Sequence, residues 1–141
     1  MVSPLHMALV AGAICNDGKV MKPYIIDHVE YIDGTEVDKT QPTEYKSIIS
    51  EVEADFLEEL MSEVVEFGTG SKLSGQSYSA YGKTGTAQVS DTTDKTNAWF
   101  VGYAKKEGYN DIAIAVIVED SGTASRYAVP IAKQVFDAYF N

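Results

Sequence analysis

Three stretches of the chain repeat apolar residues every three or four positions, which is the spacing of one buried face of a helix. The first follows Ser3-Pro4, a common helix start, and ends at an Asn-Asp-Gly turn. The second begins at Ser50, which forms a capping-box pattern with Glu53. The third contains Pro130, which fits the first helical turn because the N–H that proline lacks has no helical partner there. The positions expected to face the core are Leu5, Ala8, Leu9, Gly12 and Ala13, then Leu57, Leu60, Met61, Val64 and Val65, and finally Ala128, Ile131, Ala132, Val135, Phe136 and Tyr139.

The segment between the first two helices is predicted to hold a hairpin. Residues 23–32 are rich in β-formers and alternate, and Asp33-Gly34 marks a turn. Thr35–Val37 is the predicted return strand. Residues 38–46 are polar and include a proline, so we predict a surface loop there.

Three strand-like runs follow the second helix, at Tyr81–Val89, Asn97–Ala104 and Asp111–Val118. Their connections are short, so they are expected to form an antiparallel meander. The last two runs are apolar on both faces, which predicts a sheet covered on both sides. Ala113 and Ala115 share one face of the last run, and we expect the C-terminal helix to approach closely there. The predicted fold class is α/β with segregated layers (α+β): an antiparallel sheet of about three core strands with helices on its faces.

The charge of the chain limits its partners. Eleven Lys and Arg stand against 21 Asp and Glu, a net charge of -10, which would repel a phosphate backbone and disfavours nucleic acid as a partner. Six of the carboxylates lie on the predicted outer face of the second helix. They surround an exposed face without a glycine-turned loop of oxygen ligands, so a solvated face is favoured over a cation site. They are Glu51, Asp55, Glu58, Glu59, Glu63 and Glu66.

The remaining reactive side chains give little sign of chemistry. The single cysteine, Cys15, excludes an internal disulfide, and its setting among alanine and isoleucine favours a small buried hydrophobe over a nucleophile. His6 and His28 are far apart and have no partner at ligand spacing, so no metal or cofactor is expected. The apolar run at residues 7–15 has no preceding Lys or Arg and is not interpreted as a signal segment. No stretch reaches the roughly 18 apolar residues of a membrane span.

The sharpest motif is Gly82-Lys83-Thr84-Gly85-Thr86-Ala87-Gln88. It fits a strand that receives an anionic peptide end: Lys83 offers a compact cation, and Thr84 and Thr86 offer hydroxyl donors. Gly85 removes a side chain where another backbone comes close.

Two other interpretations of this motif are an ordinary edge strand and a phosphate-binding loop. Taken alone, Lys-Thr-Gly also fits an ordinary solvent-edge strand with a surface lysine. A phosphate-binding loop requires a glycine five positions before Gly82, where the chain has Ser77, and no helix-forming run follows. The phosphate-loop interpretation is therefore rejected.

Together with its surroundings the motif resembles the transpeptidase domain of penicillin-binding proteins, particularly the high-molecular-weight monofunctional type. The resemblance covers nearly the whole chain, in the order of the family. It implies the C-terminal part of the penicillin-binding transpeptidase and serine β-lactamase-like fold over residues 1–141. The matching segments are Ser3–Ala8, Asn16–Gly18 with Pro23, Val64-Val65, Gly68–Gly70, Lys83–Gln88, Ala98–Ala104 and the helix around Pro130.

What the resemblance implies is a D,D-transpeptidase that cross-links peptidoglycan stem peptides through an acyl-serine and binds penicillin. By the same resemblance, the substrate-binding residues Lys83, Thr84, Gly85 and Thr86 would hold the carboxylate of a D-alanyl-D-alanine peptide or a β-lactam. The backbone N–H of Thr86 would form half of the oxyanion hole.

Two motifs of the family are absent. The sequence contains neither Ser-x-x-Lys nor Ser-x-Asn, and the nearest approach, Thr92–Lys95, lacks the serine. In the family both motifs precede everything seen here, so we expect them upstream, with the membrane anchor of a protein that works at the extracytoplasmic face of the bacterial membrane. The chain alone is then expected to be inactive.

The resemblance also implies an unusual sheet edge. The family's central sheet has five strands, and the absent part would supply two of them beside Asp111–Val118. That strand is therefore expected to be an exposed apolar edge that self-associates. The alternatives are a non-catalytic penicillin-binding sensor-type relative, a β-lactamase-like protein, or an interaction module in which Lys83 is only a surface residue.

Overall fold

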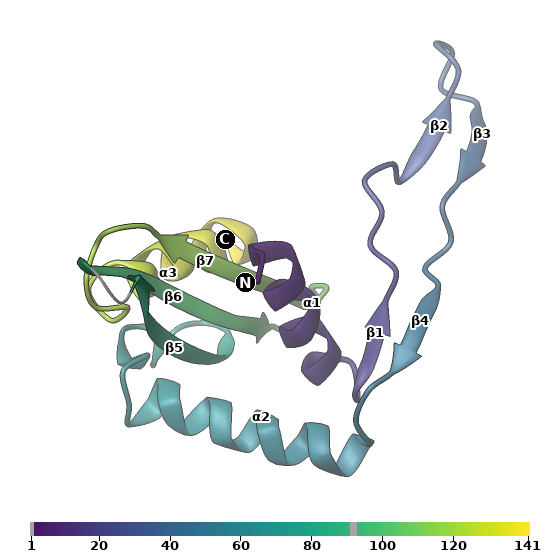
Figure 1. The fold of residues 1–141 in the computed structure, drawn as a ribbon. Coiled ribbons are helices and arrows are strands. Elements are labelled where there is room, and N and C mark those ends of the chain that lie inside the picture. The colour runs from purple at the N-terminus through teal and green to yellow at the C-terminus, as the bar shows by residue number, and fades with distance from the viewer. Residues whose placement is uncertain (1, 91–92) are drawn as a thin grey trace.

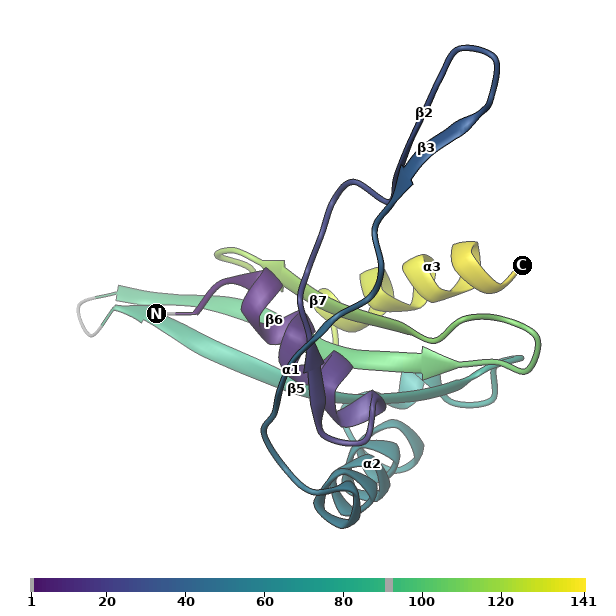
Figure 2. The ribbon, with the colours of Figure 1, turned by 90° about the vertical axis from the view of Figure 1, so that its right-hand side faces the viewer.

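The computed structural model describes residues 2–90 and 93–141. Its elements are α1 (Pro4–Cys15), β1 (Lys19–Met21), β2 (His28–Glu30), β3 (Glu36–Lys39), β4 (Glu44–Ser47), α2 (Glu51–Glu66), a short 3-10 helix (Ser71–Leu73), β5 (Ser79–Ser90), β6 (Thr93–Lys105), β7 (Ile112–Val118) and α3 (Ala128–Phe140). A three-stranded sheet in the order β5-β6-β7 forms the centre of the body (Figure 1). Helix α1 packs on one face, α3 packs on the other, and α2 runs beside β5 (Figure 2).

The predicted antiparallel meander is confirmed. Lys83 on β5 is paired with Val101 on β6, so Lys83 lies on the same face as the Trp99–Val101–Tyr103 row. Phe100 is paired with Thr84 on one side and with Val116 on the other. This register decides which side chains share a face of the sheet.

Apolar side chains fill a layer on each side of the sheet, as the two-faced pattern predicted. Between the sheet and α3, Phe100 and Phe136 are fully buried with their ring centroids 6.4 Å apart. On the other side, Ala11 of α1, Met61 of α2 and Tyr103 of β6 form a second buried cluster.

The prediction that the C-terminal helix covers the alanine face of the last strand is wrong. Helix α1, and not α3, covers that face: a Cβ built on Gly12 would lie 3.7 Å from the Cβ of Ala113, an ordinary contact. Helix α3 packs instead against the larger Ile112 and Ile114. The reason is that both faces of the strand are apolar, so the pattern of a single strand cannot assign its helices.

The prediction of which helix positions face the core is partly correct. The capping box of α2 is confirmed, with the N–H of Ser50 donating to Glu53 Oε2 at 2.8 Å and Ser50 Oγ accepting from the N–H of Glu53 at 3.3 Å. These bonds to Ser50 lower the pKa of the Glu53 carboxyl. In each helix the buried face is rotated from the predicted one. The predicted core positions that the structure exposes are Leu5, Leu60, Ile131, Val135 and Tyr139, and the buried positions not predicted are Ala11, Ala54, Val129 and Phe140.

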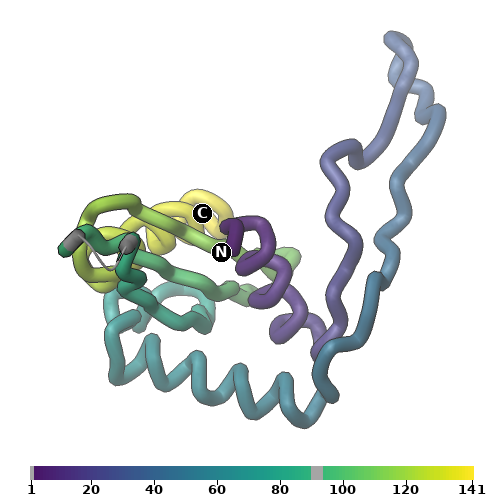
Figure 3. Tube along the Cα trace, in the orientation of Figure 1, coloured from purple at the N-terminus to yellow at the C-terminus, as the bar shows by residue number. Residues whose placement is uncertain are grey.

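The segment between α1 and α2 is a long hairpin that stands away from the body (Figure 1, Figure 3). β1 pairs with β4, and β2 pairs with β3, both antiparallel. The loop predicted at residues 38–46 is therefore wrong over most of its length, because β3 and β4 occupy it. Ile25 and Ile32 on the hairpin are fully exposed. The hairpin predicted around Asp33-Gly34 is confirmed in β2 and β3, whereas residues 38–46 have no buried face and so lack the alternation that identifies a strand in a sequence.

Candidate functional site

The motif strand β5 lies at an edge of the sheet, and its outward backbone groups can be assigned. The N–H of Ser121 donates to the carbonyl of Thr96 at 3.0 Å, so the even-numbered residues of β6 direct their backbone groups toward β7. Phe100 belongs to this set and is paired with Thr84. Because paired residues of an antiparallel ladder either exchange both hydrogen bonds or none, Thr84 and Thr86 direct N–H and C=O to the free edge.

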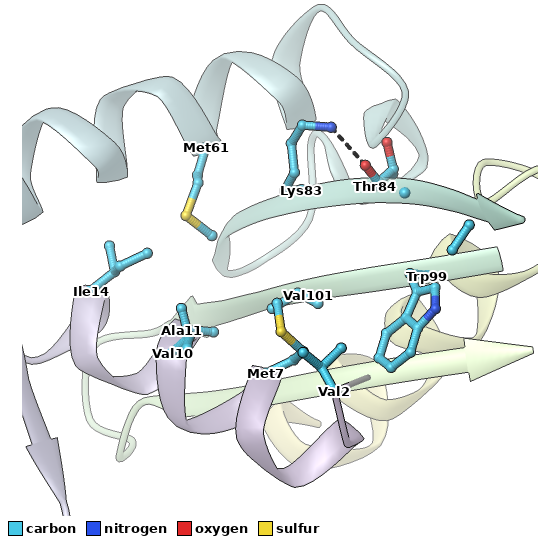
Figure 4. Close-up of a pocket in the computed structure, with 12 residues that line it drawn as sticks. Val2, Met7, Val10, Ala11, Ile14, Met61, Lys83, Thr84, Trp99 and Val101 are labelled. Atoms are coloured by element: carbon cyan, nitrogen blue, oxygen red, sulfur yellow. Dashed lines mark hydrogen bonds between the residues drawn. The ribbon is translucent and has the colours of Figure 1, made fainter. Parts of the chain in front are cut away.

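Lys83 places its cation at the same edge. Its ammonium donates to the carbonyl oxygen of Thr84 at 2.6 Å, as Figure 4 shows. This bond is consistent with a Thr84 carbonyl that points to the free edge of β5. The Lys83 side chain is exposed, so the charge remains open to a ligand.

The Thr84 side chain is buried and its hydroxyl has a partner within the protein. Thr84 is only 9% exposed, and its hydroxyl oxygen lies 2.5 Å from the hydroxyl oxygen of Thr69. Thr69 belongs to Gly68–Gly70, the loop at the end of α2, which the sequence singles out only as part of the family resemblance. Thr69 is not among the site residues predicted from the sequence, although its hydroxyl between two glycines at a helix end is a signal that could have revealed it.

A cavity of about 370 Å³ lies between α1, α2 and this part of the sheet. Figure 4 shows Met61, Trp99 and Val101 around it with Lys83 at its border. Trp99 lies within the predicted strand Asn97–Ala104, and the register with β5 brings it to the motif. The lining is almost wholly apolar and consists of Val2, Met7, Val10, Ala11, Ile14, Met61, Lys83, Thr84, Gly85, Ala87, Trp99 and Val101.

The structure brings the predicted substrate-binding residues together only in part. Lys83, Thr84 and Gly85 line the cavity, whereas Thr86 does not. The backbone N–H of Thr86 faces the free edge by register, and its side chain shares the face of Thr84. Of the Thr92–Lys95 segment, Thr92 lies outside the described residues.

A polar cluster fixes α2 to the sheet near the motif. Glu58, which the sequence placed on the solvated face of its helix, instead accepts from Lys105 Nζ at 2.6 Å and from Tyr103 Oη at 3.0 Å. Burial and the Glu58 carboxylate raise the pKa of the Tyr103 phenol. Burial alone would lower the pKa of Lys105, but Glu58 outweighs it and the pKa is raised. The prediction that all six carboxylates of this helix are solvated is therefore wrong for Glu58.

Cys15, which was predicted to be a small buried hydrophobe, is a half-buried thiol. Burial, with a contribution from Asp111, raises its pKa to about 12, and its sulfur lies 3.6 Å from Asp111 Oδ2. His28 lies on the exposed hairpin, 3.0 Å from an oxygen of Asp27. Among residues 2–90 and 93–141, no three His, Cys, Asp or Glu side chains converge to hold a metal ion. The helices of this described part all fall short of the length and apolar character needed to cross a bilayer.

Comparison with known proteins gives consistent matches. The family model for the penicillin binding protein transpeptidase domain matches residues 1–138. The peptidoglycan D,D-transpeptidase PbpA of Mycolicibacterium smegmatis is 31% identical over 144 residues, which cover 97% of this chain and 29% of the relative.

Solved structures give the same result. Penicillin-binding protein A of Mycobacterium tuberculosis, as a ceftriaxone acyl-enzyme complex, superposes with a TM-score of 0.86 at 26% identity, over 99% of this chain and 33% of that chain. The D,D-transpeptidase domain of a peptidoglycan glycosyltransferase from Eggerthella lenta gives 0.75 at 31% identity, over 95% of this chain and 32% of that one. The chain thus spans about a third or less of the length of these relatives.

Proposed function

The chain belongs to the penicillin-binding protein transpeptidase family, and from this we propose that it forms the substrate-binding part of a peptidoglycan D,D-transpeptidase. The proposed substrate is a stem peptide ending in D-alanyl-D-alanine, and a β-lactam is the proposed inhibitor at the same place. A serine hydroxyl attacks the penultimate carbonyl, and an acyl-serine forms as the terminal D-alanine leaves. The amine of a second stem peptide then takes the acyl group and frees the serine.

The arrangement of donors along the free edge of β5 carries this proposal. Lys83 supplies an ammonium there, and Thr86 directs its backbone N–H to the same edge. The ammonium attracts a terminal carboxylate, while the N–H stabilises the oxyanion that develops on the attacked carbonyl. Gly85, between them, leaves room for the backbone of the ligand.

The nucleophile must come from another segment, because the chain contains no Ser-x-x-Lys. We propose that the segment bearing this motif packs on the apolar cavity between α1 and β5. The cavity borders Lys83, so a serine on that segment comes within reach of a ligand held at the edge. Its apolar lining suits a helix with one apolar face.

The isolated chain is therefore proposed to be inactive. Intact-mass spectrometry of this chain after incubation with benzylpenicillin should show an unchanged mass. A stable adduct on the chain itself would contradict the assignment of the nucleophile to another segment.

The setting of the complete enzyme follows from its proposed substrate. Peptidoglycan is cross-linked outside the membrane, so we place the enzyme at the extracytoplasmic face of the bacterial cell membrane. The net charge of -10 argues against a nucleic-acid partner. We also propose that β7, which pairs with β6 on one side, associates with a second copy of the isolated chain through its other edge.

A further inference from the structure

Thr69 is held beside the motif strand by the loop that ends α2. Its hydroxyl oxygen lies 2.5 Å from that of Thr84. The N–H of Gly70 donates to the carbonyl of Val64 at 3.0 Å, which closes the loop onto the last turn of the helix. A Cβ at Gly68 would lie 2.9 Å from the same carbonyl oxygen, so this close approach requires glycine. The conformation of this loop therefore holds the Thr69 side chain next to Thr84.

The direction of this hydrogen bond decides what Thr84 can offer a ligand. A hydroxyl has one O–H donor and two acceptor lone pairs, whereas a carboxylate only accepts. If Thr84 donates to Thr69, it has only lone pairs left, which repel a carboxylate. If Thr69 donates to Thr84, the proton of Thr84 is free for the ligand.

We infer that Thr69 is a positioning residue for ligand recognition: it donates to Thr84 and so directs the Thr84 proton to the carboxylate of the ligand. The inference rests on the proposed function, because it requires a carboxylate at the edge of β5. Thr84 lines the cavity beside Lys83 and Thr69 does not, so Thr69 acts through Thr84. A hydroxyl that accepts a hydrogen bond is also polarised into a stronger donor.

The test compares two ligands in a polypeptide that carries this chain together with its Ser-x-x-Lys serine. Benzylpenicillin bears the carboxylate, and its methyl ester does not. Thr69→Val keeps the shape of the side chain and removes the hydroxyl, whereas Thr69→Ser keeps the hydroxyl. In Thr69→Val, the acylation rate constant should fall about tenfold for benzylpenicillin and change less than about twofold for the ester. Thr69→Ser should retain the wild-type rate with both ligands.

Other outcomes would overturn the inference. Equal slowing of both ligands in Thr69→Val would show that Thr69 only supports the fold, and thermal unfolding of the same samples would reveal that loss. Unchanged rates with both ligands would show that the Thr84 proton needs no partner. Absence of any adduct in the folded wild-type polypeptide would instead overturn the proposed function, and this inference with it.

Discussion

Oε2 of Glu58 on α2 lies 2.6 Å from Nζ of Lys105 on β6, and the two form a partly buried ion pair. The rings of Tyr81 and Tyr103 stack with their centroids 4.9 Å apart, and the ammonium lies 5.5 Å from each centroid. Glu58 and Lys105 are 47 positions apart in the chain. This contact therefore ties α2, the helix that leads into the loop of Thr69, to the strand beside the motif.

Glu58→Gln should destabilise the isolated chain. The amide keeps the shape of the side chain but leaves Lys105 and Tyr103 with a weaker acceptor, and the groups are partly solvated, so we expect a loss of about 1–2 kcal/mol in the free energy of unfolding. Urea unfolding measures it. Glu59→Gln, on the exposed face of the same helix, is the matched control and should stay within about 0.5 kcal/mol. Equal losses in the two variants would contradict the assigned role of Glu58.

Two glycine substitutions on the paired strands β5 and β6 should differ in their cost to stability. A Cβ at Gly102 would lie 2.1 Å from the carbonyl oxygen of Tyr81, whereas at Gly85 the nearest atom is Trp99 Cβ at 3.6 Å. Gly102→Ala should therefore lose about 3 kcal/mol or more of stability, and Gly85→Ala less than about 1 kcal/mol. Thermal unfolding tests this ordering, and a Gly102→Ala variant as stable as Gly85→Ala would contradict the packing described for the sheet.

Cys15 should react slowly with iodoacetamide at pH 8. Its pKa is raised to about 12, chiefly by burial and then by Asp111, so the reactive thiolate is scarce in the folded chain. Because the folded pKa is raised, the stability this thiol contributes is present below the pKa of the unfolded thiol, about 8.5, and is lost as the pH rises toward the folded value. The alkylation rate of the folded chain should keep rising up to about pH 12. In urea, the rate should instead level off above the pKa of an ordinary thiol, about 8.5.

Asp111→Asn provides a matched variant for the cysteine. Removing the carboxylate should lower the pKa of Cys15 and speed alkylation at pH 8. A folded chain that reacts at pH 8 as fast as the unfolded chain would contradict the burial of the thiol.

The free edge of β7 should make the isolated chain self-associate. Sedimentation should reveal a dimer whose fraction increases with protein concentration. Ala115 pairs with Val101, whose backbone faces β5, so the N–H of Ala115 faces away from β6. Ala115→Pro should suppress the dimer without removing a bond to β6, because proline lacks only that outward N–H. A strictly monomeric wild-type chain at high concentration would contradict the proposal.

The sequence predicted those parts of the fold that rest on local patterns. The capping box of Ser50 and Glu53 and the three runs of the meander are signals carried by neighbouring residues, and both are confirmed. The position of α1 over Ala113 was not predictable in this way, because choosing between helices for an apolar face requires packing the whole chain.

The site was predicted as a motif but not as a set of contacts. Lys83 and Gly85 are recognisable because their residue types suit an anionic ligand. The contact between Thr69 and Thr84 spans 15 positions, and that between Glu58 and Lys105 spans 47, so neither leaves a periodic trace in the sequence. On the hairpin, residues 38–46 have no buried face, so the alternation that would reveal β4 and the end of β3 is missing.

The measurement that tests the central claim most directly is intact-mass spectrometry of a polypeptide that carries this chain with its Ser-x-x-Lys motif, with and without benzylpenicillin. The account predicts one penicilloyl adduct, mapped to the serine of that motif, and slower acylation in Lys83→Gln with unchanged unfolding. No adduct on the folded polypeptide, or an adduct whose rate of formation is indifferent to Lys83, would contradict it and would favour a non-catalytic relative.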